Sequence, residues 1–419
     1  MDGGRVMRQS APPSQHYDLV IVGGGLVGAS LALALEPAGV SVAVVEPAAA
    51  DSSEQPSFDA RTVALTYNAR QIYAGLGVWE QIAAHAEMIL EIHISERGGC
   101  GMTHLSHAAA GTEALGYVVA ARVVGHALHR RMRDSDAVAL YCPATAKRLR
   151  RRDSGVEVSV SSQTGNATLN AALVVLADGG RSPLAAQAGV RAAPTAYRQC
   201  AIVSVVETDC DHRGRAFERF TAEGPLALLP HSDKRYAVVW STALPQAATR
   251  MALADGAFID ALQTAFGDRA GHFSHPAARA RYALYHGAAA RPIARRAVSI
   301  GNAAHRVHPV AGQGFNLGLR DAAALAAVIG RARRDGRDLG SPEVLEQYAA
   351  LRRRETAMVS AFTDGLIRVF GSRRRPVRVA RNLALAGIEC CPPAKRLLLR
   401  RTMGMAGRRW PPAPGDDGR

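Results

Sequence analysis

Three glycine-rich segments of the chain hold the residues whose types and spacing could do chemistry. The first has Gly23, Gly25 and Gly28 in the pattern Gly-x-Gly-x-x-Gly. Such glycines allow a tight turn and let the backbone approach a pyrophosphate, whose charge meets the positive end of the following helix. Glu46 lies 23 residues after Gly23 and could accept hydrogen bonds from a ribose. This segment predicts a dinucleotide site, without deciding between FAD and NAD.

The other two segments carry polar residues beside glycine. Asp178 and Gly179 follow an apolar run at 172–176, and an Asp-Gly pair by itself indicates only a turn. The third segment places several glycines before a helix predicted near 316–330. Its backbone N–H groups could meet a second anionic group, or the segment could be a structural loop. Its candidate binding residues are Gly301, Asn302, Gly312, Gln313, Gly314 and Asn316.

The runs around these segments predict the elements that position them. Tyr17–Val22 and Ser41–Glu46 have the continuous apolar character of buried strands, and Leu26–Leu35 between them predicts a helix. This β-α-β unit implies a parallel sheet. Ala297–Gly301 predicts a further short buried strand. Pieces of one nucleotide-binding unit therefore lie near both residue 20 and residue 300.

The middle of the chain has a different pattern. Cys200–Thr208 and Phe217–Thr221 are strand-like, and Leu226–Pro230 and Tyr236–Thr242 flank a turn like the two arms of a hairpin. An antiparallel sheet of this kind could form the wall of a substrate cavity. Beyond it, Ser341-Pro342 predicts a helix start, with serine as N-cap and proline at the first helical position.

The composition is that of a globular chain long enough for more than one domain, with 419 residues of which 48% are apolar. The net charge of +15 is uneven, because twelve basic residues face one acidic residue between Leu366 and Trp410. Such a region suits an anionic membrane surface or an acidic partner, or it is a solvated helix packed on its own protein. Without zinc-ligand spacing or an RNA-binding motif, we expect neither a metal site nor a nucleic-acid partner. Six cysteines without a C-x-x-C pair predict reduced thiols in a cytoplasmic protein.

In this order and separation, the three segments resemble the flavoprotein aromatic hydroxylases, which are single-component flavin monooxygenases. The resemblance runs from about Tyr17 to Phe370. Other stretches resemble the ubiquinone-biosynthesis branch of that family, and within it the 2-polyprenyl-6-methoxyphenol hydroxylases. These stretches are Phe58-Asp59-Ala60-Arg61, Phe217-Glu218-Arg219-Phe220, Gly224–Pro230 and the pair Gly301-Asn302.

The resemblance implies an α/β (α+β) fold. We expect a Rossmann-like FAD-binding domain of the p-hydroxybenzoate-hydroxylase type, with an inserted antiparallel-sheet substrate domain and a C-terminal helical region. The expected boundaries are a disordered tail at 1–16, an FAD-binding domain at 17–85, 111–190 and 280–340, a substrate domain at 86–110 and 191–279, and a basic helical region at 341–410.

The resemblance also implies FAD and NADPH as cofactors. The first segment would bind the ADP half of FAD, and Asp178-Gly179 would touch both FAD and the route of NADPH. Arg61 and Arg122 match polar residues near the FAD, although either could be a solvated charge in so arginine-rich a chain. The family usually has aspartate where this chain has Asn302. An amide still accepts and donates hydrogen bonds, but it removes one negative charge beside the cofactor.

The activity that the resemblance implies is NADPH-dependent transfer of one atom of molecular oxygen to a polyprenylated methoxyphenol. His308, beside the expected flavin loop, could assist deprotonation of the phenol or hold a structural hydrogen bond. Arg219 and Phe220 could reach the substrate or serve packing alone. The basic C-terminal region could bring the protein to the inner face of the cytoplasmic membrane or into a quinone-biosynthesis complex.

Two other functions are compatible with the same residues. A flavin-dependent reductase of this fold would consume no oxygen. A non-catalytic flavin-binding scaffold of a quinone-biosynthesis complex would hold FAD without substrate-dependent oxidation of NADPH. Likeness of fold alone does not decide between these chemistries.

Overall fold

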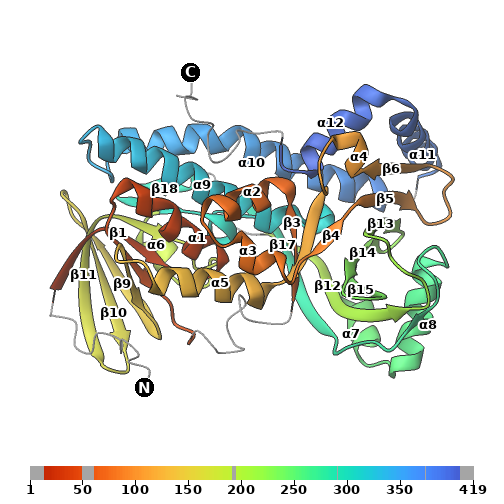
Figure 1. The fold of residues 1–419 in the computed structure, drawn as a ribbon, viewed down its shortest axis with the longest axis horizontal. Helices are drawn as coiled ribbons and strands as arrows, with labels where there is room; N and C mark the ends of the chain where they lie inside the picture. The colour runs from red at the N-terminus through yellow and green to blue at the C-terminus, as the bar shows by residue number, and fades with distance from the viewer. Residues whose placement is uncertain (1–13, 50–60, 191–194, 290, 373, 406–419) are drawn as a thin grey trace.

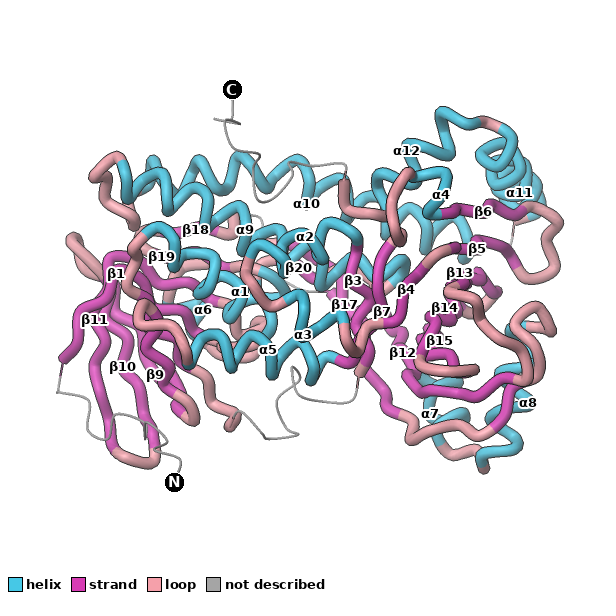
Figure 2. The backbone as a smooth tube through the Cα atoms, viewed as in Figure 1, coloured by secondary structure: helices cyan, strands magenta, loops and turns pink. Residues whose placement is uncertain are grey.

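Two large β-sheets lie side by side, with helices between them and along one side of the molecule (Figure 1). The computed structural model describes residues 14–49, 61–190, 195–289, 291–372 and 374–405. Figure 2 shows that strands gather at the two ends of the molecule and that helices fill the middle. This mixed architecture confirms the predicted fold class.

The first sheet has eight strands, in the order β18-β19-β11-β1-β2-β8, with β10 and β9 continuing from β11. β1 pairs in parallel with β11 and β2, and β11 pairs in parallel with β19. The predicted β-α-β unit and the strand near residue 300 thus lie in one sheet. The strands are β1 (Ser14–Val22), β2 (Val42–Val45), β8 (Val138–Tyr141), β9 (Ala144–Arg151), β10 (Val156–Ser162), β11 (Gly165–Leu176), β18 (Ile293–Ala294) and β19 (Ala297–Ser299).

The start of β1 corrects the expected tail at 1–16. Residues 14–16 are strand, because β11 is long enough to pair with β1 from Ser14 onward, where Ser14 lies opposite Thr168. Residues 1–13 lie outside the described part of the chain.

Helices α1 (Leu26–Leu35), α5 (Ala121–Arg133) and α9 (Gln313–Arg334) pack together beside this sheet. The helix predicted between the first two strands has the predicted bounds. Its residues are buried almost all round, including Leu31, Ala32 and Leu35, because it lies between the sheet and two other helices. α9 begins three residues before the predicted helix and continues to Arg334.

The second sheet has nine strands, and its order is β20-β17-β12-β15-β14-β13-β5-β6, with β16 beside β12. The predicted hairpin is confirmed, since β14 and β15 pair antiparallel. One face is covered by α7 (Leu244–Met251) and α8 (Asp255–Phe266) around a core that includes Trp240 and Phe258. The strands are β5 (Glu91–Glu96), β6 (Met102–Ser106), β12 (Thr195–Thr208), β13 (Arg215–Thr221), β14 (Gly224–His231), β15 (Arg235–Ala243), β16 (Phe273–Ser274), β17 (Ala280–Ala288) and β20 (His305–Arg306).

Two of the expected domain boundaries do not follow the sheets. β17, which begins at the boundary proposed at residue 280, pairs with β12 in the nine-stranded sheet. Segment 86–110 is divided, because β4 pairs with β7 in a separate three-stranded sheet while β5 and β6 join the nine-stranded one. The small sheet and its helices are β3 (Thr62–Thr66), β4 (Glu87–Ile89), β7 (Gly116–Ala120), α2 (Tyr67–Gly75), α3 (Trp79–Ala83) and α4 (His107–Ala110).

The C-terminal part is helical, as predicted. The Ser341 hydroxyl accepts a hydrogen bond from the Val344 N–H, which caps a helix of 30 residues with proline in its first turn. The helices are α10 (Pro342–Gly371), α11 (Arg375–Cys390) and α12 (Pro392–Thr402). None of the described helices is both long enough and apolar enough to cross a membrane.

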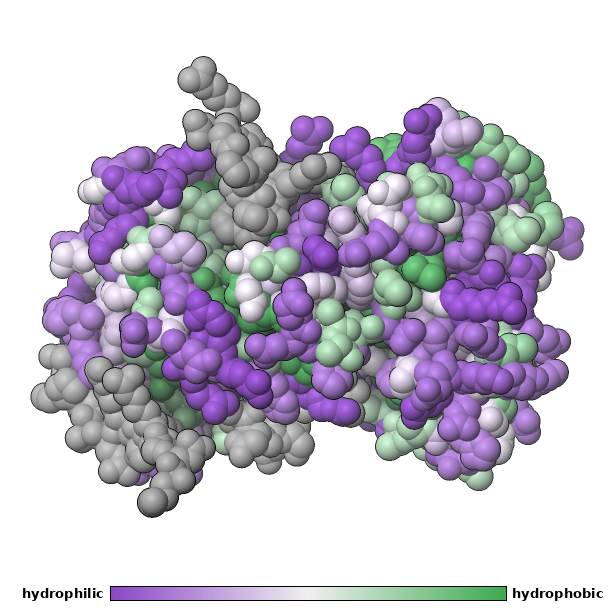
Figure 3. Space-filling model, viewed as in Figure 1, coloured by the Kyte–Doolittle hydropathy of each residue, from purple (hydrophilic) through white to green (hydrophobic). Residues whose placement is uncertain are grey.

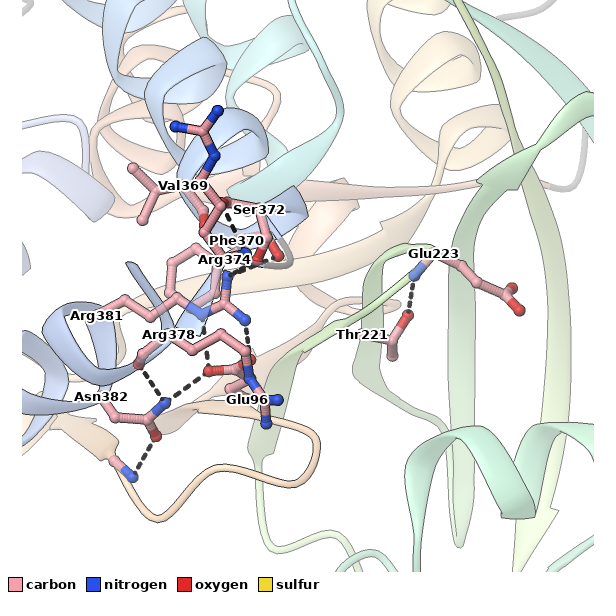
Figure 4. Close-up of polar contacts among 11 residues, drawn as sticks. Glu96, Thr221, Glu223, Val369, Phe370, Ser372, Arg374, Arg378, Arg381 and Asn382 are labelled. Atoms are coloured by element: carbon pink, nitrogen blue, oxygen red, sulfur yellow. Dashed lines mark hydrogen bonds and ion pairs between the residues drawn. The ribbon is translucent and has the colours of Figure 1, made fainter. Parts of the chain in front are cut away.

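A buried ion pair holds α11 against strand β5 (Figure 4). Arg381 Nε donates to Glu96 Oε2 at 2.8 Å, and its Nη2 contacts Glu96 Oε1. The carbonyl oxygens of Val369, Phe370 and Ser372 lie within 3.0 Å of Arg381 Nη1. This guanidinium therefore joins β5, the end of α10 and the start of α11.

Replacing Arg381 by alanine should destabilise the protein, because it leaves the buried Glu96 carboxylate without its main partner. We expect the free energy of unfolding to fall by about 3 kcal/mol in urea denaturation of the FAD-loaded chain. Arg378→Ala is the matched control, since Arg378 is on the same helix, half exposed and 3.9 Å from Glu96. Its loss should stay below about 1 kcal/mol. Equal losses for the two variants would contradict the role given to Arg381.

Candidate functional site

The three glycine-rich segments meet at one cavity. β1, β11 and β19 are parallel neighbours, so the loops at their carboxyl ends lie together at one edge of the sheet. The cavity there has a volume of about 430 Å³. Of the predicted cofactor-binding residues, nine line it: Gly23, Gly25, Glu46, Arg61, Asp178, Gly179, Gly301, Asn302 and Gly314.

Glycine is required where these segments touch one another. A Cβ on Gly28 would lie 1.9 Å from the Gly23 carbonyl oxygen, and a Cβ on Gly23 would lie 2.6 Å from the Ala177 carbonyl oxygen. On the other side, a Cβ on Gly318 of α9 would lie 2.9 Å from the Gly301 Cα. Gly28 is thus placed under the cavity as a packing residue, while Gly23 and Gly25 line it.

Glu46 is buried at the end of β2. Its Oε2 accepts from the Gly24 N–H at 2.8 Å and its Oε1 from the Ala48 N–H at 2.9 Å. A carboxylate has about four acceptor positions, so two remain for ribose hydroxyls. Glu46 thus lies at the cavity, as the sequence predicts, and its side chain also holds the first loop in place.

The second segment is an ordered turn at the edge of the cavity. Asp178 Oδ1 accepts from the Gly180 N–H at 2.9 Å, and Oδ2 accepts from the Ser182 N–H at 3.0 Å. Arg306 Nη2 donates to the Gly179 carbonyl oxygen at 2.8 Å and its Nε to that of Asn302 at 3.4 Å. Arg306 therefore ties the second segment to the third.

Asn302 presents a free side chain to the cavity. It is exposed, and its amide makes no hydrogen bond within the described part of the chain. Gly314 and Phe315, in the first turn of α9, line the same cavity. The positive end of a long helix and an unengaged amide thus face the space where an anionic group would bind.

Asn316 has a structural position instead. Its Oδ1 accepts from the Thr66 N–H at 2.9 Å, and its Nδ2 donates to the carbonyl oxygens of Ala64 and Gly312 at 2.8 and 2.7 Å. It holds β3 to the start of α9. Gly312 and Gln313 do not line the cavity either, and Gly312 caps α9 at φ +62°, in the left-handed region.

Asp321 is the residue whose role the sequence did not reveal. Its fully buried carboxylate accepts from the Gly301 N–H at 3.0 Å, from Arg352 Nε at 2.7 Å and from His305 Nε2 at 2.5 Å. Burial alone would raise its pKa, but His305, Arg352 and the Gly301 N–H outweigh burial and hold the pKa well below its usual range. The charged Asp321 thus anchors the loop that carries Asn302.

Of the two arginines predicted near the cofactor, one lies at the cavity and the other does not. Arg61 lines the cavity, and its guanidinium lies 4.7 Å from the centre of the Tyr282 ring. Arg122 is exposed in the first turn of α5 and does not line the cavity, where the neighbouring Ala121 does. Phe58, Asp59 and Ala60, which carried part of the resemblance, lie outside the described residues.

His308 is fully buried next to the start of α9. Its Nδ1 accepts from the Val310 N–H at 3.2 Å, so the neutral ring carries its hydrogen on Nε2. Burial lowers the pKa of His308 to about 4, although Asp364 partly offsets this. Nε2 has no partner within the described chain. The arrangement favours a neutral hydrogen-bond donor over the base that deprotonation of a phenol would need.

Arg219 and Phe220, which the sequence grouped together, lie on opposite faces of β13. Phe220 stacks on Phe370, with ring centroids 3.7 Å apart, and packs against Val310 beside the third segment. Arg219 points to the α8 side, where its guanidinium lies 5.7 Å from the centre of the Phe266 ring. Alternation along a strand separates adjacent side chains in this way.

The glycine contacts give a direct test of the cavity. Gly28→Ala should abolish retention of the dinucleotide, because the added Cβ would collide with the Gly23 carbonyl oxygen and push the first loop out of position. Gly256→Ala is the control, since a Cβ there has nothing within 4 Å. The ratio of flavin to protein absorbance after purification measures retention. Full retention in Gly28→Ala would show that this loop does not hold the cofactor.

Comparison with known proteins also indicates a dinucleotide-binding protein, and it identifies the family. The family model described as FAD binding domain matches residues 16–363. Ubiquinone hydroxylase UbiL of Rhodospirillum rubrum is 37% identical over 92% of this chain and 89% of that protein. The 3-demethoxyubiquinol 3-hydroxylase of Escherichia coli is 31% identical over 94% of this chain and 100% of that protein.

Among solved structures, p-nitrophenol 4-monooxygenase PnpA from Pseudomonas putida has a TM-score of 0.78 at 19% identity, over 95% of this chain and 100% of that one. This similarity extends the agreement to the fold. The chain therefore belongs to the FAD-binding domain family together with the ubiquinone hydroxylases, and its cofactor is FAD.

Proposed function

We propose that the protein is an FAD- and NADPH-dependent monooxygenase that hydroxylates a polyprenylated methoxyphenol in ubiquinone biosynthesis. The observation that carries the proposal is the position of the FAD cavity beside an apolar sheet face. Relatives named as hydroxylases of ubiquinone or its precursors match nearly the whole chain, which supports the same reaction class here.

The apolar face belongs to the nine-stranded sheet, on the side away from α8. Ala227, Val239 and Val203 lie opposite one another on β14, β15 and β12, and Leu229 follows Ala227 on the same face. All four are only partly buried. Tyr282 shares this face and meets Arg61 of the FAD cavity. Aliphatic side chains in this position suit a prenylated ring better than a charged substrate.

When bound, FAD supplies the chemistry: reduced by NADPH, it reacts with molecular oxygen and adds one oxygen atom to an activated ring. The protein's own residues have other tasks. The start of α9 offers N–H donors and a positive end to negative charge near Gly314. Asp178-Gly179 lies at the cavity, where exposed Arg181 could meet the phosphates of NADPH.

The test is oxygen uptake driven by NADPH in the FAD-loaded protein, with and without a short-chain 2-prenyl-6-methoxyphenol. A product heavier by one oxygen atom, formed only with the phenol, is the expected result, and the isomer formed gives the ring position. NADPH oxidation without oxygen uptake would favour a reductase. Bound FAD without phenol-dependent turnover would favour a scaffold.

We also propose contact with an anionic membrane surface through α11 and α12. Val379 is 60% and Leu383 67% exposed, and they lie four residues apart on one side of α11. Arg375 and Arg378 on α11 and Arg396 on α12 are exposed as well. Figure 3 shows hydrophobic surface gathered over these two helices. Apolar residues flanked by arginine suit a helix that lies on anionic lipid and would bring the enzyme to a membrane-borne substrate.

Val379→Asp/Leu383→Asp should weaken binding to phosphatidylglycerol vesicles at least tenfold in a flotation assay, because the carboxylates oppose both insertion and anionic lipid. Leu351→Asp is the control, since Leu351 is 43% exposed on α10, away from these helices. The control should bind like the unchanged protein. If all three proteins bind equally, α11 does not contact the bilayer, and its apolar side would be left for a protein partner.

A further inference from the structure

A group of cations without acidic partners lies on the α8 side of the nine-stranded sheet, opposite the face that meets the FAD cavity. His93 and Ser95 of β5 share this face with Phe217 and Arg219 of β13, because these residues are directly paired. Arg97 follows at the end of β5, and Arg269 reaches His93 from the turn after α8. We define Arg97, Arg219 and Arg269, together with the neutral ring of His93, as the cation cluster.

The three arginines of the cation cluster form no ion pair within the described residues. Glu91, a carboxylate on this face of β5, is already engaged by Arg215 at 2.8 Å and by His104 at 3.2 Å. The arginines instead act on one another, since Arg269 and Arg97 add to burial in lowering the pKa of Arg219. A bound anion would offset this repulsion.

Two buried N–H groups of the cation cluster are unpartnered. Arg269 Nη1 donates to His93 Nε2 at 2.9 Å, so the neutral His93 ring carries its hydrogen on Nδ1. His93 is only 9% exposed, and Nδ1 has no partner in the described chain. Arg219 Nε is likewise buried without a partner. Buried donors are almost always paired, so these two indicate a ligand that accepts hydrogen bonds.

Burial and the surrounding arginines keep His93 uncharged near neutral pH. Desolvation, then Arg269, His104, Arg215 and Arg219, lower the pKa of His93 to about 4. His93 therefore supplies a hydrogen-bond donor and the three arginines supply the positive charge.

We propose that the cation cluster binds a phosphate group. Arginine guanidinium groups and a neutral imidazole N–H match the acceptor oxygens and the negative charge of a phosphate group, whether monoester or diester. The phosphate could be that of a soluble compound or the headgroup of an anionic lipid at the surface that α11 approaches. This site is separate from the FAD cavity and does not depend on the proposed hydroxylase activity.

The test compares Arg219→Gln/Arg269→Gln with the unchanged chain, both loaded with FAD, in phosphate and in chloride at equal ionic strength. Phosphate should raise the Tm of the unchanged chain by several degrees and leave the variant unmoved. Without phosphate, the variant should melt close to the unchanged chain, because relief of the repulsion offsets the lost hydrogen bond from Arg269 to His93. Arg235→Gln is the control, since Arg235 is paired with Asp233 in the β14–β15 turn, and it should respond like the unchanged chain.

A second measurement identifies the source of the phosphate. Weaker binding of the Arg219→Gln/Arg269→Gln variant to phosphatidylglycerol vesicles, with phosphate competing for the unchanged chain, assigns the site to lipid headgroups. Vesicle binding equal to that of the unchanged chain assigns it to a soluble phosphate compound. The proposal is overturned if phosphate shifts the Tm of the variant and the unchanged chain equally or shifts neither. A Tm of the variant far below that of the unchanged chain in chloride would also overturn it, since the arginines would then be structural.

Discussion

The site depends on one buried charge, the carboxylate of Asp321. This carboxylate accepts hydrogen bonds from the Gly301 N–H, His305 and Arg352. It therefore joins the loop after β19 to α9 and α10. Arg352 in turn meets Glu355, which also pairs with Arg320. An isolated buried charge is costly, whereas a carboxylate with this many partners fixes their positions strongly. The loop that presents Asn302 is rigid because its first N–H ends on this carboxylate.

The two sheets divide the work of the site. The parallel sheet brings three segments of distant sequence to one edge, where a Cβ added at Gly23 would lie 2.6 Å from the Ala177 carbonyl oxygen, so there is no room for a side chain. The antiparallel sheet supplies an apolar face. The Arg61 guanidinium, at the cofactor cavity, contacts the ring of Tyr282, on the antiparallel sheet. A cofactor cavity with apolar surface beside it follows from this meeting, and neither sheet would form it alone.

Local patterns in the sequence predicted the elements well where a single element buries its own residues. The helix Leu26–Leu35, the hairpin of β14 and β15 and the Ser341 cap were all predicted. Residues with partners far along the chain were not. The sequence groups Asn316 with the cofactor-binding residues, because nothing nearby shows that Thr66 and Ala64, about 250 residues away, use its amide. The role of Asp321 was missed for the same reason, since Arg352 lies on another helix.

The alternation of β5 explains how one strand serves two unrelated surfaces. Glu96 turns to one face and takes Arg381 of α11, while His93 and Ser95 turn to the other and meet the arginines near α8. Phe220 and Arg219 on β13 divide in the same way. A shift of register by one residue would bury the arginines under α11 and expose Glu96. The ion pair of Glu96 with Arg381 therefore fixes the position of α11 and, through the register of β5, the face on which the cation cluster forms.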